Sequence, residues 1–115
     1  MPKMLDIPDA IEQAGGNPEL ARELFTMLLQ ELPVLKTKLN QAFNNADNES
    51  LWNLAHKIHG STSYCGVPQL QQATIELETA IKNQASDIAD KMQNVNQAID
   101  ELLAGGQALL EQEWS

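Results

Sequence analysis

The sequence predicts an all-α protein: an antiparallel four-helix bundle preceded by a short N-terminal helix. Apolar residues recur at helical spacing along most of the chain. Residues with β-branched side chains are sparse and never alternate over a useful length, so no segment is typical of a strand. Because the breaks between helical segments are short, consecutive helices should lie side by side and antiparallel.

The first two helices are marked by their start and stop signals. A short helix opens at Asp6 or Pro8, runs through Ala14 and ends at Gly15-Gly16. A second helix starts at Asn17-Pro18, since Asn is a favoured N-cap and Pro a favoured first helical residue. The sequence therefore predicts a short helix followed closely by a long helical segment.

Pro33 interrupts this long segment. Either one helix ends at Leu32 and another begins, or a single long helix has a kink at Pro33. The helical pattern continues to a break at Asn44–Asn48. The expected core residues on both sides of Pro33 are Leu20, Leu24, Met27, Leu28, Leu32, Leu35, Leu39, Ala42, Phe43 and Ala46.

Two further helices flank a predicted turn at Gly66-Val67-Pro68. The first covers residues 49–64 with Asn48 as its cap, and the second starts at Pro68. The inward-facing residues of the first helix are Leu51, Ala55, Ile58, Thr62 and Cys65. Those of the second are Leu70, Ala73, Leu77, Ala80 and Ile81.

The last long helix follows a break at Asn83–Ser86, with Ser86 as its cap. Gly105-Gly106 should loosen its end, and an apolar C-terminal extension either packs or frays. We expect one domain over residues 1–115, with a core at 7–103 and an extension at 104–115. The core residues are Ile88, Met92, Val95, Ile99 and Leu102, and the apolar residues of the extension are Leu109, Leu110 and Trp114.

Charge and composition exclude several classes of function. The net charge is −9 with only seven Lys and Arg, which argues against binding to nucleic acid or to an anionic membrane. Cys65 is the single cysteine, so an internal disulfide is excluded and a reducing compartment is favoured. No apolar run reaches the roughly 20 residues of a membrane span. We therefore expect a cytoplasmic chain.

Residues 54–66, LAHKIHGSTSYCG, contain two features that a packed helix does not need: two histidines three residues apart, and a glycine after them. At about 100° per residue, His56, His59 and Ser63 share one side of the helix, beside its core stripe. His56 should therefore lie at the edge of the buried face or be exposed. Gly60 either ends the helix or lies inside it, and the apolar spacing beyond it favours a continuous helix.

Metal binding and hydrolysis are weakly supported by this segment. A metal site needs three or four ligands, the histidine pair supplies two, and Asn53 stands where a Glu-x-x-His motif requires Glu. The sequence thus predicts no metal site. Ser61, Ser63 or Cys65 could serve as a nucleophile, but the glycine pattern of a nucleophile elbow is absent.

A phosphoryl relay fits the segment better. A neutral imidazole is nucleophilic near neutral pH and can carry a phosphoryl group covalently. A relay needs an exposed histidine, donors for the phosphate oxygens and open space for a partner. His56 would be the carrier, while Trp52, on the same side, is either a docking contact or packed against a neighbouring helix. The supporting residues are Lys57, His59, Gly60 and Ser63.

The segment AHKIHGSTSYCGVPQLQQATIELE resembles the signature of histidine-containing phosphotransfer (HPt) domains, A-H-x-L-[KH]-G-S-x-x-x-x-G-x-x-x-L-x-x-x-x-x-x-L-E. Upstream, AIEQAGGNPELARELFTMLLQELP is similar to the N-terminal part of the family, so the resemblance runs from about Ile7 to about Leu103. The pattern H-x-x-H-G-S followed by Y-x-G-V-P most resembles the C-terminal HPt domain of BarA/GacS-type hybrid sensor kinases. The matching residues are Ala55, His56, Ile58, Gly60, Ser61, Gly66, Leu70, Leu77 and Glu78.

The resemblance implies that His56 accepts a phosphoryl group from a receiver-domain aspartate and passes it to a response-regulator aspartate. The receiver would supply Mg²⁺, so no cofactor is expected on this chain. Many members have Lys at the position of His59, so the support from His59 should depend on pH. Glu78 either accepts the other ring N–H of His56 and fixes its tautomer or is a solvated carboxylate.

The chain lacks a nucleotide-binding motif and a glycine-rich phosphate loop, so we expect a phosphotransfer intermediate without kinase activity of its own. The resemblance implies a parent hybrid sensor histidine kinase that could be anchored in the inner membrane. This domain should act as a monomer and contact receiver domains, but neither nucleic acid nor membrane. The alternative is a helical adaptor whose histidines are incidental.

Overall fold

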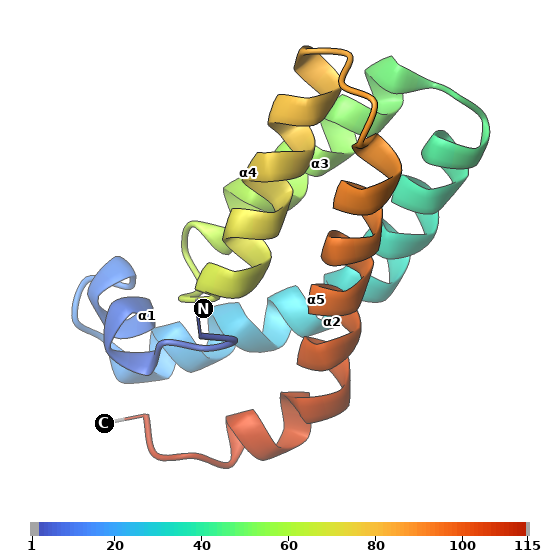
Figure 1. Cartoon of the computed structure of the whole chain (residues 1–115). Helices are drawn as coiled ribbons and strands as arrows, with labels where there is room; N and C mark the ends of the chain where they lie inside the picture. Colours follow the sequence, from blue (N-terminus) through green and yellow to red (C-terminus); the bar gives the residue numbers. More distant parts are fainter. Residues whose placement is uncertain (1–2, 115) are drawn as a thin grey trace.

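The computed structural model describes residues 3–114. Its helices are α1 (Ile7–Gln13), α2 (Pro18–Asn44), α3 (Asn48–Thr62), α4 (Pro68–Lys82) and α5 (Ile88–Leu110). No strand occurs among these residues, which confirms the predicted all-α class. Figure 1 shows α2 to α5 running antiparallel in a four-helix bundle, with α1 at one end.

The predicted starts of the first two helices are confirmed. The Asp6 carboxylate accepts a hydrogen bond from the backbone N–H of Asp9 at 3.1 Å, so Asp6 is the N-cap of α1 and Pro8 lies in its first turn. The Asn17 side chain accepts from the N–H of Leu20 at 3.1 Å. Both caps satisfy an N–H that has no partner inside the helix.

Two predicted caps are wrong by one residue. Asp47, not Asn48, caps α3, because its carboxylate accepts from the N–H of Ser50 at 3.1 Å. Hydrogen bonds from the side chain and backbone of Ser50 lower the pKa of Asp47. At α5 the cap position belongs to Asp87 rather than Ser86, and the Asp87 side chain makes no capping hydrogen bond.

A single helix passes through Pro33, as one of the two alternatives predicted. Because proline has no N–H, the carbonyl four residues earlier loses its helical partner, and helices commonly bend at such a point. Figure 1 shows α2 changing direction between its blue N-terminal part and its teal C-terminal part.

The predicted buried face of α2 is partly wrong. Leu20 and Met27 are 39% and 53% exposed, and Leu24 is only half-buried. The buried residues instead follow steps of four and three, which keep one stripe facing the bundle along a long helix. Ala46, also expected in the core, lies exposed in the turn after α2 at φ 54°. The buried stripe is Ala21, Phe25, Leu28, Leu32, Leu35, Leu39 and Ala42.

The predicted cores of the remaining helices are largely confirmed. Every inward-facing residue predicted between Leu51 and Ile81 is buried, and so are the residues predicted on α5 except Ile88, which is half-buried. Thr74 is an addition: it is fully buried, and its hydroxyl donates to the Leu70 and Gln71 carbonyls at 3.1 and 2.8 Å. A buried hydroxyl paired in this way carries little penalty.

Gly105-Gly106 does not loosen α5, contrary to expectation. The helix continues to Leu110, and Gly106 packs closely there: a Cβ at Gly106 would lie 2.9 Å from Leu29 Cδ1. The extension packs rather than frays. Trp114 is buried, its indole N–H donates to the Leu109 carbonyl at 3.3 Å, and its ring centroid lies 5.7 Å from that of Phe25.

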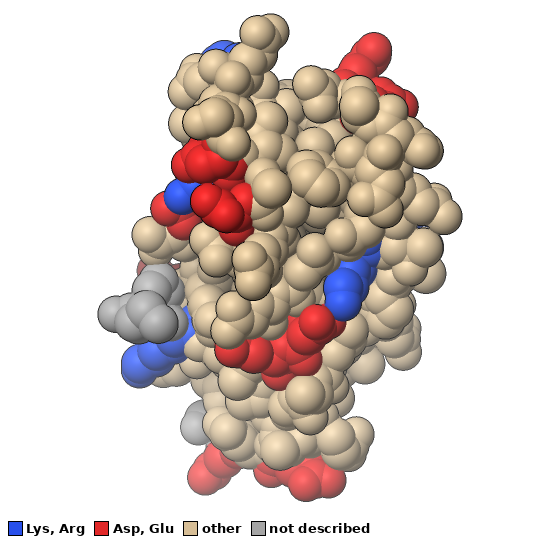
Figure 2. Space-filling model, turned by 45° about the vertical axis from the view of Figure 1, so that its right-hand side comes forward, with Lys and Arg blue, Asp and Glu red and all other residues tan. Residues whose placement is uncertain are grey.

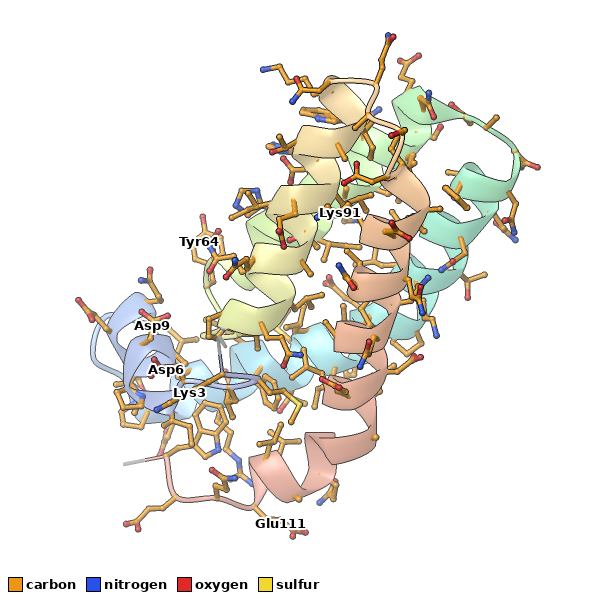
Figure 3. The ribbon with its side chains drawn as sticks, in the orientation of Figure 1. Lys3, Asp6, Asp9, Tyr64, Lys91 and Glu111 are labelled. Carbon is orange, nitrogen blue, oxygen red and sulfur yellow. The ribbon has the colours of Figure 1, made fainter. Side chains whose placement is uncertain are left out.

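Backbone hydrogen bonds join the segment before α1 to the turn between α3 and α4 and to the start of α4. The N–H of Asp6 donates to the Gly66 carbonyl at 2.7 Å, and the N–H of Gln69 donates to the Lys3 carbonyl at 3.0 Å. Figure 3 places Lys3 and Asp6 near this turn. Gly66 has φ +62°, a left-handed conformation that glycine adopts at little cost.

The surface is predominantly acidic, as the net charge of −9 requires. On the face shown in Figure 2, Asp and Glu cover more area than Lys and Arg. Among residues 3–114, no helix combines the length and the apolar character needed to cross a membrane.

Candidate functional site on α3 and α4

His56 lies on the surface of α3, as predicted. Its side chain is 61% exposed, whereas its neighbours Ala55 and Ile58 are fully buried. The helix continues through Gly60 to Thr62, which confirms the predicted continuous helix. The buried stripe therefore fixes α3 in the bundle and turns the His56 imidazole to solvent.

Glu78 on α4 reaches both histidines of α3. Its two carboxylate oxygens lie 3.4 Å from Nδ1 of His56 and 3.0 Å from Nδ1 of His59. A carboxylate can only accept, so each contact calls for a proton on Nδ1. The Glu78 and His59 side chains are only 15% and 29% exposed. We call His56, His59 and Glu78 the His–Glu–His cluster.

Trp52 supports the His56 ring from one turn earlier on α3. The two ring centroids are 4.9 Å apart and the planes differ by 7°, which is a stacked arrangement. Trp52 is half-buried and packs against the core, which agrees with the packing alternative, while a docking contact through Trp52 stays a prediction.

The contacts of His56 leave one ring nitrogen available. Glu78 occupies the Nδ1 side and Trp52 covers one face of the ring. Nε2 has no hydrogen-bond partner within residues 3–114. With the proton on Nδ1, Nε2 carries the lone pair, so the arrangement presents a nucleophilic nitrogen to solvent.

Of the other predicted site residues, Lys57 and Gly60 lie at the open surface near His56, whereas the Ser63 hydroxyl is bonded to the backbone. Lys57 is exposed beside His56. A Cβ at Gly60 would meet nothing within 4 Å, so the surface one turn from His56 is open. The Ser63 hydroxyl donates to the His59 carbonyl at 3.1 Å, and its proton is therefore engaged by the backbone rather than directed to His56.

The structure also has a hollow that the sequence did not predict. It lies between α2 and the end of α3, and Met27 and Tyr64, which are 53% and 59% exposed, form part of its lining. Figure 3 shows Tyr64 projecting from the end of α3. The sequence pattern assigned Met27 to the core, and Tyr64, which opens the Y-x-G-V-P pattern, was given no role in the site.

Cys65 also lines this hollow and is buried. Burial, with a smaller contribution from the Glu31 charge, raises the pKa of its thiol to about 11. Since the thiolate is the nucleophilic form, Cys65 is a poor nucleophile at neutral pH. The structure thus supports the expectation that it packs as a small apolar residue.

The four-helix bundle and the exposed His56, which faces a carboxylate from the next helix, agree with the resemblance to histidine-containing phosphotransfer domains. The chain belongs to the Hpt domain family, whose model matches residues 23–105. It is similar to the HPt domain of a sensor hybrid histidine kinase from Shewanella, with a TM-score of 0.86, 28% identity and 97% of both chains covered.

The chain is also similar to two curated proteins. It is 34% identical to the sensor protein GacS of Pseudomonas syringae pv. syringae over 90% of this chain. It is 31% identical to the signal transduction histidine-protein kinase BarA of Escherichia coli strain K12 over 86% of this chain. These matches cover only 11% and 12% of the length of the two relatives.

Proposed function

We propose that this chain is the histidine phosphotransfer module of a multistep phosphorelay. His56 takes a phosphoryl group from the aspartyl phosphate of one receiver domain and gives it to the aspartate of another. The observation that carries this proposal is the His56 imidazole: it is exposed, its Nδ1 faces Glu78, and its Nε2 has no hydrogen-bond partner within residues 3–114.

In the proposed transfer, each bond that forms is matched by one that breaks, and the groups on this surface accommodate the change in charge. The Nε2 lone pair attacks phosphorus, the bond from phosphorus to the aspartyl oxygen breaks, and the receiver's carboxylate leaves with its electron pair. The ring keeps its Nδ1 proton and becomes cationic. Glu78 at 3.4 Å stabilises that positive charge. The reverse step, with a second aspartate as nucleophile, returns the ring to its neutral form.

The remaining residues have supporting roles in this proposal. Lys57 and the protonated form of His59 attract the phosphoryl oxygens. Gly60 leaves room for the receiver to approach, consistent with the open space around its Cα. Ser63 contributes indirectly, because its hydroxyl holds the carbonyl of His59.

The proposed docking surface continues from Gly60 to the hollow lined by Met27 and Tyr64. Exposed apolar and aromatic side chains of this kind commonly anchor interfaces. The receiver brings the Mg²⁺ that neutralises the transferred group, so the module itself uses no cofactor. We propose that it acts as a monomer that meets one receiver at a time.

We propose that the parent protein is a hybrid sensor kinase, since GacS and BarA are named as sensor and histidine kinases and this chain matches about a ninth of their length. The kinase reaction would then belong to other parts of the parent. A helical adaptor with incidental histidines is the alternative, and the geometry of Glu78 disfavours it, because an incidental histidine needs no oriented carboxylate.

The test is direct transfer from a phosphorylated receiver. Wild-type protein should acquire an acid-labile label, as expected for a phosphoramidate on histidine. His56→Gln should acquire none, while the matched control His59→Gln should still be labelled at a lower rate. The chain has two histidines, so these two variants test every histidine that could carry the label. Label that persists in His56→Gln contradicts the proposal.

A further inference from the structure

The His–Glu–His cluster supplies what the sequence did not offer for metal binding: a third ligand. The two histidines of α3 are the only ones in the chain, and Glu78 reaches them from α4. One potential ligand atom from each residue lies within 4.8 Å of the other two. The folded bundle therefore converts an insufficient pair into a set of three.

The distances fit a tetrahedral metal. Zinc bonds of about 2.0–2.2 Å to imidazole nitrogen and carboxylate oxygen place neighbouring ligand atoms about 3.3–3.5 Å apart. Oε2 of Glu78 lies 3.4 Å from Nδ1 of His56, and Oε1 of Glu78 lies 3.0 Å from Nδ1 of His59. Side-chain rotation is needed to turn both Nδ1 atoms towards one ion, starting from ligand atoms that lie within 4.8 Å of one another. Since the His56 side chain is 61% exposed, water can fill the fourth position.

The electrostatics also favour a cation. Within residues 3–114, no Lys or Arg lies within salt-bridge distance of Glu78, whose ion-pair partners are the two histidines. Its carboxylate is thus available to a metal without breaking a salt bridge to a permanent cation. Cys65, the only thiol, does not compete, because it is buried and its pKa is raised to about 11.

We propose that His56, His59 and Glu78 bind Zn²⁺ or a similar divalent transition-metal ion and that the bound ion blocks phosphotransfer. Two imidazoles, one carboxylate and one water form a ligand set that zinc accepts readily. Nickel and copper share the preference for imidazole, whereas Mg²⁺ prefers oxygen ligands and is not the expected occupant.

The inhibition of phosphotransfer by the bound ion follows from the tautomer of His56. When the metal takes the Nδ1 lone pair of the neutral ring, the ring proton resides on Nε2 and the displaced Nδ1 proton moves there through solvent. Nε2 then has no lone pair for attack on phosphorus. This consequence rests on the proposed function, whereas metal binding itself does not.

Calorimetric titration of zinc chloride into the apo protein tests the site. We expect one ion per chain in the wild type. His59→Gln and Glu78→Gln each remove one ligand and should weaken binding by about tenfold or more. The control Glu76→Gln makes the same charge change on α4 at a carboxylate that faces Lys91 at 3.7 Å, and it should bind zinc as the wild type does.

Nitrogen NMR of the wild type provides a second measurement that is independent of any variant's folding. Zinc should shift the Nδ1 resonances of both imidazoles and leave Nε2 of His56 protonated. The proposal is overturned if the wild type binds no stoichiometric zinc, if neither imidazole responds, or if Glu76→Gln weakens binding as much as Glu78→Gln.

Phosphotransfer with added zinc tests the block. Transfer to the wild type should fall in proportion to the zinc occupancy measured by calorimetry. The residual transfer of His59→Gln should resist the same zinc concentration, which controls for zinc acting on the receiver. Equal inhibition of both proteins overturns the block. If transfer is absent without zinc, the proposed function fails, and calorimetry still decides the metal site.

Discussion

Gly66 should be the least replaceable glycine in the chain. It lies at φ +62° in the turn between α3 and α4. A Cβ there would come within 2.5 Å of the Asp6 carbonyl oxygen, 2.7 Å of the Ala10 Cβ and 2.8 Å of the Ala10 nitrogen. Two of these atoms belong to the backbone, so the substitution Gly66→Ala cannot be absorbed by a side-chain rotation.

The expected loss has two parts. A left-handed alanine costs about 1–2 kcal/mol, and an extra carbon in a closely packed place costs about 1–3 kcal/mol. The sum of about 2–5 kcal/mol is a large share of the roughly 5–15 kcal/mol by which a domain is stable. If α1 detaches instead of the whole bundle unfolding, the loss is limited to the free energy with which α1 is docked.

Urea denaturation of wild type, Gly66→Ala and Gly60→Ala measures this difference. Gly60 is the matched control: it lies inside α3 and its Cβ would meet open space. Alanine there should raise stability by up to about 1 kcal/mol. Hydrogen exchange at the N–H of Asp6, which donates to the Gly66 carbonyl, reports detachment of α1. If Gly66→Ala costs less than about 1 kcal/mol and the N–H of Asp6 stays as protected as in the wild type, the close approach deduced from the structure is wrong.

Four further predictions concern other parts of the molecule. The ratio of the phosphotransfer rate of His59→Lys to that of wild type should rise from pH 6 to pH 8, because lysine stays charged while a typical imidazole loses its charge near pH 6.5; a constant ratio contradicts the role given to His59. At pH 8, maleimide should modify Cys65 roughly a hundredfold more slowly than a free thiol of pKa about 8.5, since the Cys65 pKa is about 11. The Cys65 thiol keeps its proton to higher pH in the folded protein than in the unfolded chain. Its contribution to stability is therefore present below pH 9 and is lost as the pH rises towards 11. Unfolding midpoints that do not decline over this range would show that the thiol is not buried. Asn17→Ala should lower the free energy of unfolding by about 1 kcal/mol because it removes the cap on Leu20, whereas the control Asn94→Ala on exposed α5 surface should leave it nearly unchanged.

The local features of this protein were accessible from the sequence. Asn17-Pro18 predicted the start of α2 because capping and the fixed φ of proline act within one turn. The continuity of α3 through Gly60 was predictable because apolar residues on its far side keep helical spacing. The exposure of His56 followed from the same spacing, since a residue outside the buried stripe faces solvent.

Features that depend on the partner surface were not accessible. The sequence pattern placed Met27 in the core of α2 and did not include Phe25, and contact with the other helices decided that Phe25 is buried and Met27 is not. Gly105-Gly106 resembles a helix end, yet α5 continues because Gly106 packs against Leu29. Local propensity near a helix terminus is weak compared with packing of this kind.

In the candidate site, too, some features were predictable from the sequence and others depend on how the helices pack. The sequence by itself determined the exposed position of His56, the neighbouring His59 and the open space at Gly60, because these residues lie within two turns of one helix. Only the tertiary structure decided that one carboxylate, Glu78, serves both imidazoles at 3.4 and 3.0 Å. The packing of α3 against α4 sets those distances, and helical periodicity gives a residue's face but not its distance from another helix.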